Sequence, residues 1–194
     1  APPVVICDPN PEVRARHKAL GRETVASLSE LPEVRVAVLA FKPQHFQGAI
    51  KALKAALAED ALIISVMVGI STTTIADALP GVRIVRTMPN TPMAVGEGMT
   101  GVAAGIGATE ADVALATFIC ESSGQVLRVE ESQIDDIAAV SGSGPAYVFR
   151  FCEAMVHAAR SQCGFSEADA EQLVRQTVRG AFTYLCQQDG FPAA

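Results

Sequence analysis

The chain has 194 residues, 49% of them hydrophobic, and a formal net charge of -6. Its length allows one well-packed domain and part of a second, and its acidic balance, with scattered Lys and Arg, argues against a nucleic-acid-binding surface. No apolar run reaches the roughly 20 residues that a membrane helix needs, so we expect no membrane partner.

The first two thirds of the chain alternate between strand and helix signals. Runs that predict strands cover residues 3–7, 34–41, 61–68 and 82–86, and two further β segments are expected over 101–107 and 124–129. Apolar residues at helical spacing predict helices over residues 12–20, 46–57, 71–80 and 110–122. The run over 34–41 is apolar apart from Arg35, which is typical of a parallel strand covered by helices on both faces.

Alternating strands and helices with short connections predict an α/β fold with a doubly wound parallel sheet. Such sheets bind ligands outside the carboxyl ends of their strands, so residues that follow strands are the first candidates for a site. From Ile134 onward no strand pattern recurs, and residues 145–160 and 166–188 predict long helices. We therefore expect two domains, residues 1–132 and residues 133–194.

Two short motifs are the most informative residues of the chain. Met88-Pro89-Asn90-Thr91-Pro92 follows the strand predicted over 82–86, and Ser141-Gly142-Ser143-Gly144-Pro145-Ala146-Tyr147 opens the first long helix. Together, and in this order, they resemble the pyrroline-5-carboxylate reductase family.

The resemblance implies a function in proline biosynthesis, the reduction of Δ1-pyrroline-5-carboxylate to L-proline by hydride transfer from NADPH or NADH. It implies a partial Rossmann-like dinucleotide-binding domain over residues 1–132, followed by an all-helical dimerisation and substrate domain over 133–194, in a homodimer or an assembly of dimers. The family also has a first βα unit with a Gly-x-Gly-x-x-Gly turn and a later Ser-Pro-Gly-Gly-Thr-Thr-like region. Neither is matched here, so we expect a chain truncated at both ends.

The resemblance places the cofactor along the carboxyl ends of the strands. The residues implied are Asp8, Asn10, Ala40, Phe41, Lys42, Pro43, Val66, Met67, Val68, Met88 and Asn90. An acid at the position of Asp8 accepts hydrogen bonds from ribose hydroxyls and repels a 2′-phosphate, which favours NADH over NADPH. A turn that caps a helix is the alternative for Asp8-Pro9, and a solvated surface charge is the alternative for Lys42. Met67 and Val68 are bulkier than the small residues that the family has there.

The substrate residues implied by the resemblance are Glu131, Asn90, Thr91, Ser141, Gly142, Ser143 and Gly144. Pro89 and Pro92 restrain the loop that carries Asn90, and the Ser-Gly run offers hydroxyls and amides at a helix start, which suits a small carboxylate. Glu131 would lie near the imine nitrogen and favour the iminium form. The alternative for the Asn90 loop is a rigid structural turn, that for the Ser-Gly run is a glycine-rich helix cap, and that for Glu131 is a solvated acidic turn. No general acid is assigned.

Two other functions stay open. The first alternative is a catalytically incompetent fragment that acts only as an oligomerisation or binding module. The second is a related reductase of another imine or carbonyl substrate. The five cysteines form no CxxC pair, so we expect reduced thiols in the core, no metal site and a cytoplasmic location.

Overall fold

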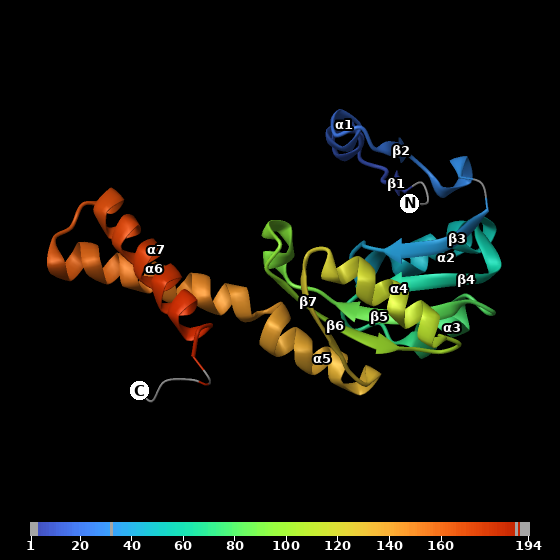
Figure 1. The fold of residues 1–194 in the computed structure, drawn as a ribbon. Helices are drawn as coiled ribbons and strands as arrows, with labels where there is room; N and C mark the ends of the chain where they lie inside the picture. Colours follow the sequence, from blue (N-terminus) through green and yellow to red (C-terminus); the bar gives the residue numbers. More distant parts are fainter. Residues whose placement is uncertain (1–3, 32, 189, 191–194) are drawn as a thin grey trace. The chain divides into compact units, whose positions relative to one another are not determined.

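A computed structural model of the chain describes residues 4–31, 33–188 and 190 (Figure 1). The chain divides into two units, residues 1–142 and residues 143–194. The strands of the described residues all lie in the first unit, whereas the second is helical.

A five-stranded sheet forms the centre of the first unit, with the strand order β3-β4-β5-β6-β7. Its strands are β3 (Val34–Leu39), β4 (Leu57–Ser65), β5 (Arg83–Met88), β6 (Gly98–Ala104) and β7 (Gly124–Arg128). The pairs are parallel except β5 and β6, which are antiparallel. A five-residue 3₁₀ helix, η3 (Thr91–Val95), joins those two strands, and so short a connection cannot make the crossover that parallel strands need. The predicted Rossmann-like sheet is confirmed, with one antiparallel pair added.

A second, two-stranded sheet holds the first strands of the chain. β1 (Val5–Cys7) pairs in parallel with β2 (Glu23–Val25), and α1 (Pro11–Ala19) connects them. Asn10 caps α1, because its side chain accepts a hydrogen bond from the Glu12 amide. A further 3₁₀ helix, η1 (Leu28–Glu30), follows β2.

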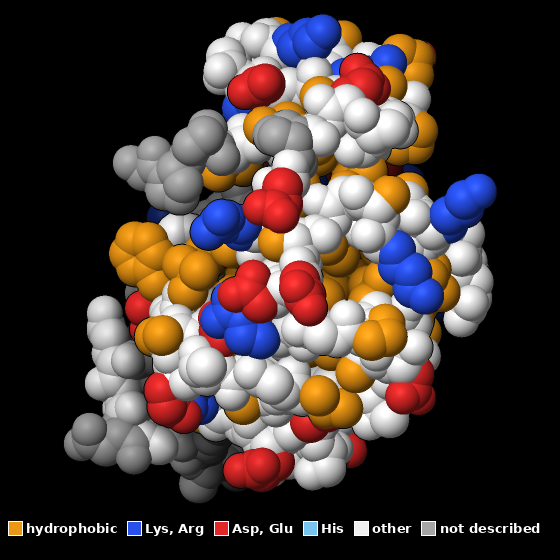
Figure 2. All heavy atoms as spheres, turned by 90° about the vertical axis from the view of Figure 1, so that its right-hand side faces the viewer, with side chains coloured by type: hydrophobic (Ala, Val, Ile, Leu, Met, Phe, Trp, Pro, Cys, Tyr) orange, Lys and Arg blue, Asp and Glu red, His pale blue; other side chains and the backbone are white. Residues whose placement is uncertain are grey.

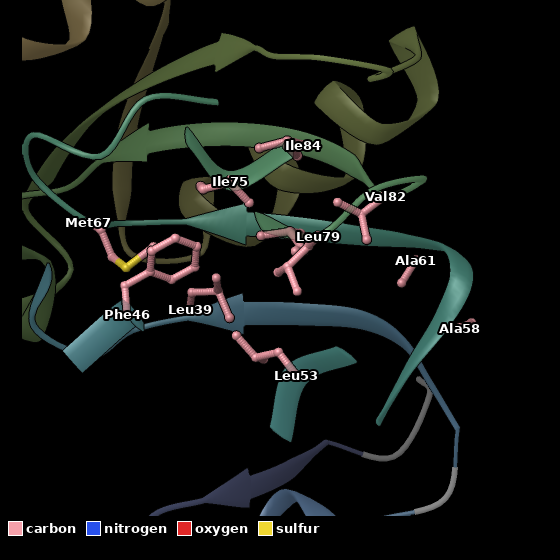
Figure 3. Packing of buried hydrophobic residues seen from close by; sticks show 11 residues of the cluster. Leu39, Phe46, Leu53, Ala58, Ala61, Met67, Ile75, Leu79, Val82 and Ile84 are labelled. Atoms are coloured by element: carbon pink, nitrogen blue, oxygen red, sulfur yellow. The ribbon is translucent and has the colours of Figure 1, made fainter. Parts of the chain in front are cut away.

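Helices cover both faces of the larger sheet. Helices α2 (Phe46–Ala56) and α3 (Thr72–Ala78) pack on one face, around Leu39, Ile63 and Ile84, and α4 (Glu110–Glu121) packs on the other. Figure 3 shows the first of these cores, in which Phe46 and Met67 lie side by side. The predicted strands and helices up to residue 122 are thus present, with shifts of a few residues at their ends.

The prediction that β3 is covered by helices on both faces is wrong. Leu39 is buried in the core, but Val36 and Val38 are 45% and 51% exposed in the described structure. The strand lies at the edge of the five-stranded sheet, where α4 does not cover it.

The end of the first unit is a series of short helical turns. These are η4 (Glu131–Gln133), α5 (Ile134–Ile137) and the π-helical turn η5 (Ala138–Gly142). Ile137 would collide with a Cβ at Gly101, so the glycine on β6 lets α5 lie close to the sheet. The predicted domain boundary after residue 132 lies within η4, whereas the two units divide after residue 142.

The second unit consists of α6 (Gly144–Cys163) and α7 (Glu167–Leu185). Gly164, with φ of 74°, ends α6, and Ser166 caps α7 by accepting from the Asp169 amide. No helix in the described part of the chain combines the length and hydropathy that crossing a bilayer requires.

The five cysteines are free thiols. Burial is the main cause that raises the pKa of Cys7 and of Cys120, so both stay protonated at neutral pH. Cys163 and Cys186 are exposed, so the expectation of core residues is wrong for these two.

Candidate active site

The carboxyl ends of β3, β4 and β5 meet at one edge of the sheet. Leu39 pairs with Ser65 and Ser65 pairs with Arg86, so the three strands end nearly level. The segments that follow them are residues 40–43, 66–69 and 89–92. The structure therefore brings three of the predicted segments to one edge, which is where α/β sheets bind ligands.

The segment after β3 presents main chain and one charge. Ala40 and Lys42 are exposed, whereas the side chain of Phe41 packs against the core. Pro43 begins the 3₁₀ helix η2 (Pro43–His45), which leads into α2. The exposed side chain of Lys42 could therefore reach a phosphate, and its exposure is equally typical of a solvated surface charge. Figure 2 shows basic side chains interspersed with acidic ones on one face of the molecule.

The segment after β4 hides its largest side chain. Met67 is only 2% exposed and packs in the core beside Phe46 (Figure 3). Its bulk therefore does not face the edge, and the segment presents Val66 and Val68 there together with main chain. Gly69 has φ of 73°, and no atom lies within 4 Å of the position where its Cβ would be. An open, glycine-containing strand end of this kind fits a dinucleotide that lies against the backbone.

The turn after β1 is held by its own hydrogen bonds. One carboxylate oxygen of Asp8 accepts from the Asn10 amide at 2.8 Å, and the Arg14 guanidinium donates to the carbonyl oxygens of Asp8 and Pro9. The hydrogen bonds of a turn that caps a helix, the alternative for Asp8-Pro9, are thus present. The second carboxylate oxygen of Asp8 has no partner among the described residues, so the cap does not exclude a contact with ribose.

Asn90 joins the two sequence motifs. Its Nδ2 donates to the carbonyl oxygen of Ser141 at 3.2 Å and lies 3.1 Å from the Ser141 Oγ, while its Oδ1 accepts from the Met99 amide at 2.9 Å. Beside it, a Cβ at Gly142 would lie 2.6 Å from the Met88 Cε. The Asn90 amide is therefore occupied in holding Ser141 against the start of β6. Thr91 is exposed and begins η3 next to it.

Glu131 is bound on the α3 side of the sheet. Its two carboxylate oxygens accept from the Thr72 amide at 2.7 Å and the Thr72 hydroxyl at 2.5 Å, and one lies 3.8 Å from the Arg86 guanidinium. The side chain is 29% exposed. Glu131 is thus no freely solvated acid, because it caps the first turn of α3.

The remaining motif residues belong to the second unit. Ser143 precedes α6, and Gly144 is its first residue, followed by Pro145. The Ser141–Gly144 motif therefore spans the junction of the units, and its first two residues are the ones in contact with Asn90 and Met88.

Sequence reasoning did not identify Arg86, Asp135 or Thr72. Arg86 donates to the Asp135 carboxylate at 2.7 Å although its side chain is only 3% exposed. The available signal was a basic residue in the apolar run over 82–88, because a buried arginine requires acidic partners. Its partners are 45 and 49 residues away in the chain, where no periodicity identifies them.

Two family models match the chain. The model described as pyrroline-5-carboxylate reductase dimerisation matches residues 131–194, and the model described as NADP oxidoreductase, coenzyme F420-dependent, matches residues 3–69. These regions are the helical end of the chain and the segment that contains Asp8 and Lys42.

Solved structures share the fold. A pyrroline-5-carboxylate reductase from Coxiella burnetii has a TM-score of 0.84 and 35% identity, with 96% of this chain and 71% of that chain covered. A Plasmodium falciparum pyrroline carboxylate reductase with NADP bound has a TM-score of 0.78 and 28% identity, with 87% and 64% covered.

Sequence relatives agree with the structural ones. A pyrroline-5-carboxylate reductase from Vibrio alginolyticus is 41% identical over 162 residues, which are 82% of this chain and 59% of the relative. One from Arabidopsis thaliana is 33% identical over 197 residues, with 96% of this chain and 71% of the relative covered. The chain thus spans about three fifths to seven tenths of the length of these relatives, and it belongs to the pyrroline-5-carboxylate reductase family.

Proposed function

We propose that the chain reduces Δ1-pyrroline-5-carboxylate to L-proline with NADPH or NADH. The observation that carries the proposal is the contact of Asn90 with Ser141. This contact joins the two motifs that the family shares, next to the carboxyl ends of the strands of a Rossmann-like sheet. When bound, the cofactor supplies a hydride to the imine carbon, and the ring nitrogen ends with a proton.

The cofactor would lie along the carboxyl edge, with support from three features of this chain. Gly69 is exposed with open space at its Cβ position, and Lys42 is exposed for a phosphate. One carboxylate oxygen of Asp8 has no partner among the described residues and could accept from a ribose hydroxyl. The Plasmodium falciparum relative contains NADP. Asp8 favours NADH in this chain, because its negative charge opposes a 2′-phosphate.

The substrate would bind at the two motifs. Asn90, with its amide occupied, would act by holding the loop of Thr91 and the backbone of Ser141 in place, so that little entropy is lost when the substrate is positioned. The amides and hydroxyls of Ser141 to Gly144 would receive the carboxylate. Glu131, which has acceptor capacity beyond its bonds to Thr72, would face the iminium.

The partner that we propose is a second copy of the chain, forming a homodimer or an assembly of dimers. The match to a dimerisation model over residues 131–194 and the exposed aromatic side chains of α6 and α7 support this. The free thiols favour a reducing compartment such as the cytoplasm.

The direct test measures oxidation of NADPH and NADH at 340 nm with Δ1-pyrroline-5-carboxylate, and proline by chromatography, beside the Vibrio alginolyticus relative as a positive control. Equimolar proline and oxidised cofactor would support the proposal. Turnover of other cyclic imines but not of this one would instead identify a related reductase.

A second candidate function is a binding or oligomerisation module without turnover. The match of a dimerisation model to residues 131–194 and the exposed aromatic side chains of α6 and α7 favour this candidate. Self-association without proline formation, and without a rise of the melting temperature on addition of either nucleotide, would decide for it, because a ligand of the folded state must stabilise that state.

A further inference from the structure

Arg86 is a buried cation on a central strand. Alternation along β5 places Ile84, Arg86 and Met88 on the sheet face that α3 and α5 cover. Ile84 packs in the hydrophobic core on this face, yet the next residue on the same face is an arginine with 3% of its side chain exposed. A buried charge is costly unless its partners are well placed, so its contacts deserve a functional explanation.

The partners of Arg86 come from the segment that precedes the Ser-Gly motif. The guanidinium lies 2.7 Å from an Asp135 carboxylate oxygen on α5 and 3.8 Å from a Glu131 oxygen on η4. Its Nε is buried and has no hydrogen-bond partner within the described part of the chain. The ion pairs therefore offset only part of the cost of burying the guanidinium. Contacts with two carboxylates nevertheless fix where η4 and α5 lie on β5.

Glu131 extends the clamp to a third element. Its oxygens accept from the amide and hydroxyl of Thr72 at the start of α3. Thr72 is itself buried against Gly105, where a Cβ would lie 2.4 Å from the Thr72 Cγ2. Arg86 thus connects β5 to α3 through Glu131 and to α5 through Asp135.

The same strand then carries the residues that receive the end of the segment. Met88 packs next to Gly142, and Asn90 binds Ser141. The segment 131–142 consequently lies along β5 with the Arg86 ion pairs at its beginning and the Asn90 hydrogen bonds at its end. A change at the first anchor should be felt at the second, because a short, packed segment moves as one piece.

We propose that Arg86 is a positioning residue for the reductase site, acting through Asp135 and Glu131 on the placement of Ser141 and Gly142. This inference rests on the proposed function. It assigns Arg86 to the substrate side of the site, so loss of its guanidinium should impair capture of the imine more than capture of the nucleotide.

The kinetic test compares Arg86→Met, Arg86→Lys and Asp135→Asn with Arg83→Met as a matched control. Arg83 lies on the same strand and pairs with Asp112 at 2.6 Å, at the other end of β5. We expect Arg86→Met to raise KM for the imine about tenfold, with the nucleotide Kd changed less than about twofold. Arg86→Lys should recover part of the loss, because an ammonium pairs with one carboxylate but does not fork between two. Asp135→Asn should give a smaller rise of KM, and Arg83→Met none.

A second test does not depend on turnover. Hydrogen–deuterium exchange followed by mass spectrometry should be faster over residues 134–142 in Arg86→Met and in Asp135→Asn than in the wild type. In Arg83→Met it should be faster only near the start of α4. Asp135 is 60% exposed, so Asp135→Asn remains a usable variant if Arg86→Met does not fold.

The outcomes separate the two proposals. If the wild type forms no proline but both variants exchange faster over 134–142, the proposed function is overturned and the coupling of Arg86 to the segment is supported. Unchanged exchange over 134–142 in both variants, or equal changes of KM and kcat in Arg86→Met and Arg83→Met, would overturn the positioning role.

Discussion

The carboxylate of Asp8 lies at the end of β1, where a cofactor ribose would meet the chain. Replacing it by Asp8→Asn removes the charge but keeps an oxygen that accepts from the Asn10 amide. We expect the ratio of kcat/KM for NADPH to that for NADH to rise about tenfold, because a charge repulsion near a protein surface is worth about 1 to 4 kcal/mol. Steady-state kinetics with both nucleotides measures this ratio.

A matched control for Asp8→Asn is Glu23→Gln, which removes an exposed acid from the neighbouring strand β2. This variant should leave the nucleotide preference as it is. An unchanged preference in Asp8→Asn as well would mean that Asp8 only stabilises the turn, through its hydrogen bond from the Asn10 amide and the contact of its carbonyl oxygen with Arg14.

Asp112 makes the stability of the first unit depend on pH. Burial by itself would raise its pKa, but hydrogen bonds from the Thr109 hydroxyl and amide, together with the Arg83 guanidinium, outweigh burial and lower it. A carboxyl with a lowered pKa in the folded state contributes stability above its unfolded pKa of about 3.9, and this contribution is lost as the pH falls through the folded value.

Asp112→Asn should therefore reduce the free energy of unfolding by about 1 to 3 kcal/mol at pH 7, since it weakens hydrogen bonds to a charged group. The difference from the wild type should shrink as the pH falls below about 4, because the carboxyl then binds a proton more readily in the unfolded chain than in the folded one. Urea unfolding at several pH values measures both effects. Glu110→Gln is the control, because Glu110 forms an exposed pair with Arg128 and should matter much less. A difference in the free energy of unfolding that is the same at all pH values would contradict the lowered pKa of Asp112.

At the scale of elements, the core strands and helices could be predicted because each is a run with a clear period. β4 contains the apolar run of residues 61–64, β5 contains Ile84 and Val85 between two arginines, and α4 has a capping box at Thr109 and Asp112. β2 is only three residues long and was missed. The direction of β6 could not be read from its side chains, because it depends on the short connection η3.

The site was predictable to the extent that it consists of loops after strands. Asn90 and Ser141 were both identified, but their hydrogen bond across 51 residues was not. The burial of Met67 was also missed, because one methionine after a strand has no period that shows which way it points. The clamp of Arg86, Glu131 and Asp135 depends on tertiary packing, which the local sequence does not encode.

Two glycines predict opposite effects on the elements that contain them. Gly124 begins β7 with φ of 145°, and a Cβ there would lie 2.1 Å from the Gly98 carbonyl oxygen. Gly124→Ala should cost about 3 kcal/mol or more, because a strained backbone and a collision with another main chain add together. Gly48 lies inside α2 with open space around its Cβ position, so Gly48→Ala should stabilise by about 0.5 to 1 kcal/mol.

Thermal and urea unfolding of the two variants, side by side, checks these signs. A small loss in Gly124→Ala would mean that β6 and β7 separate easily at their first residues. A loss in Gly48→Ala would mean that a partner approaches the outer face of α2.

At the scale of the whole molecule, the aromatic side chains of α6 and α7 lie uncovered among the residues that the structure describes. No residue of α6 is fully buried, and the exposed side chains include Phe149, Phe151 and Tyr184. An apolar groove runs between α6 and α7, lined among others by Phe151, Met155 and Phe182. An exposed apolar surface of this size is typical of an interface, so in the proposed homodimer we expect another copy of the chain to cover it.

Phe151→Asp should therefore dissociate the assembly. A charge in an apolar interface is desolvated without a partner, and loss of an aromatic anchor commonly costs about 2 to 4 kcal/mol, so we expect the self-association constant to fall about 100-fold. Sedimentation velocity over a range of concentrations measures this, and circular dichroism shows whether the fold survives. Phe118→Asp on α4 makes the same change at an exposed site of the first unit and should leave the mass unchanged. If Phe151→Asp sediments like the wild type, copies of the chain associate through another surface, and the groove between α6 and α7 is not where they meet.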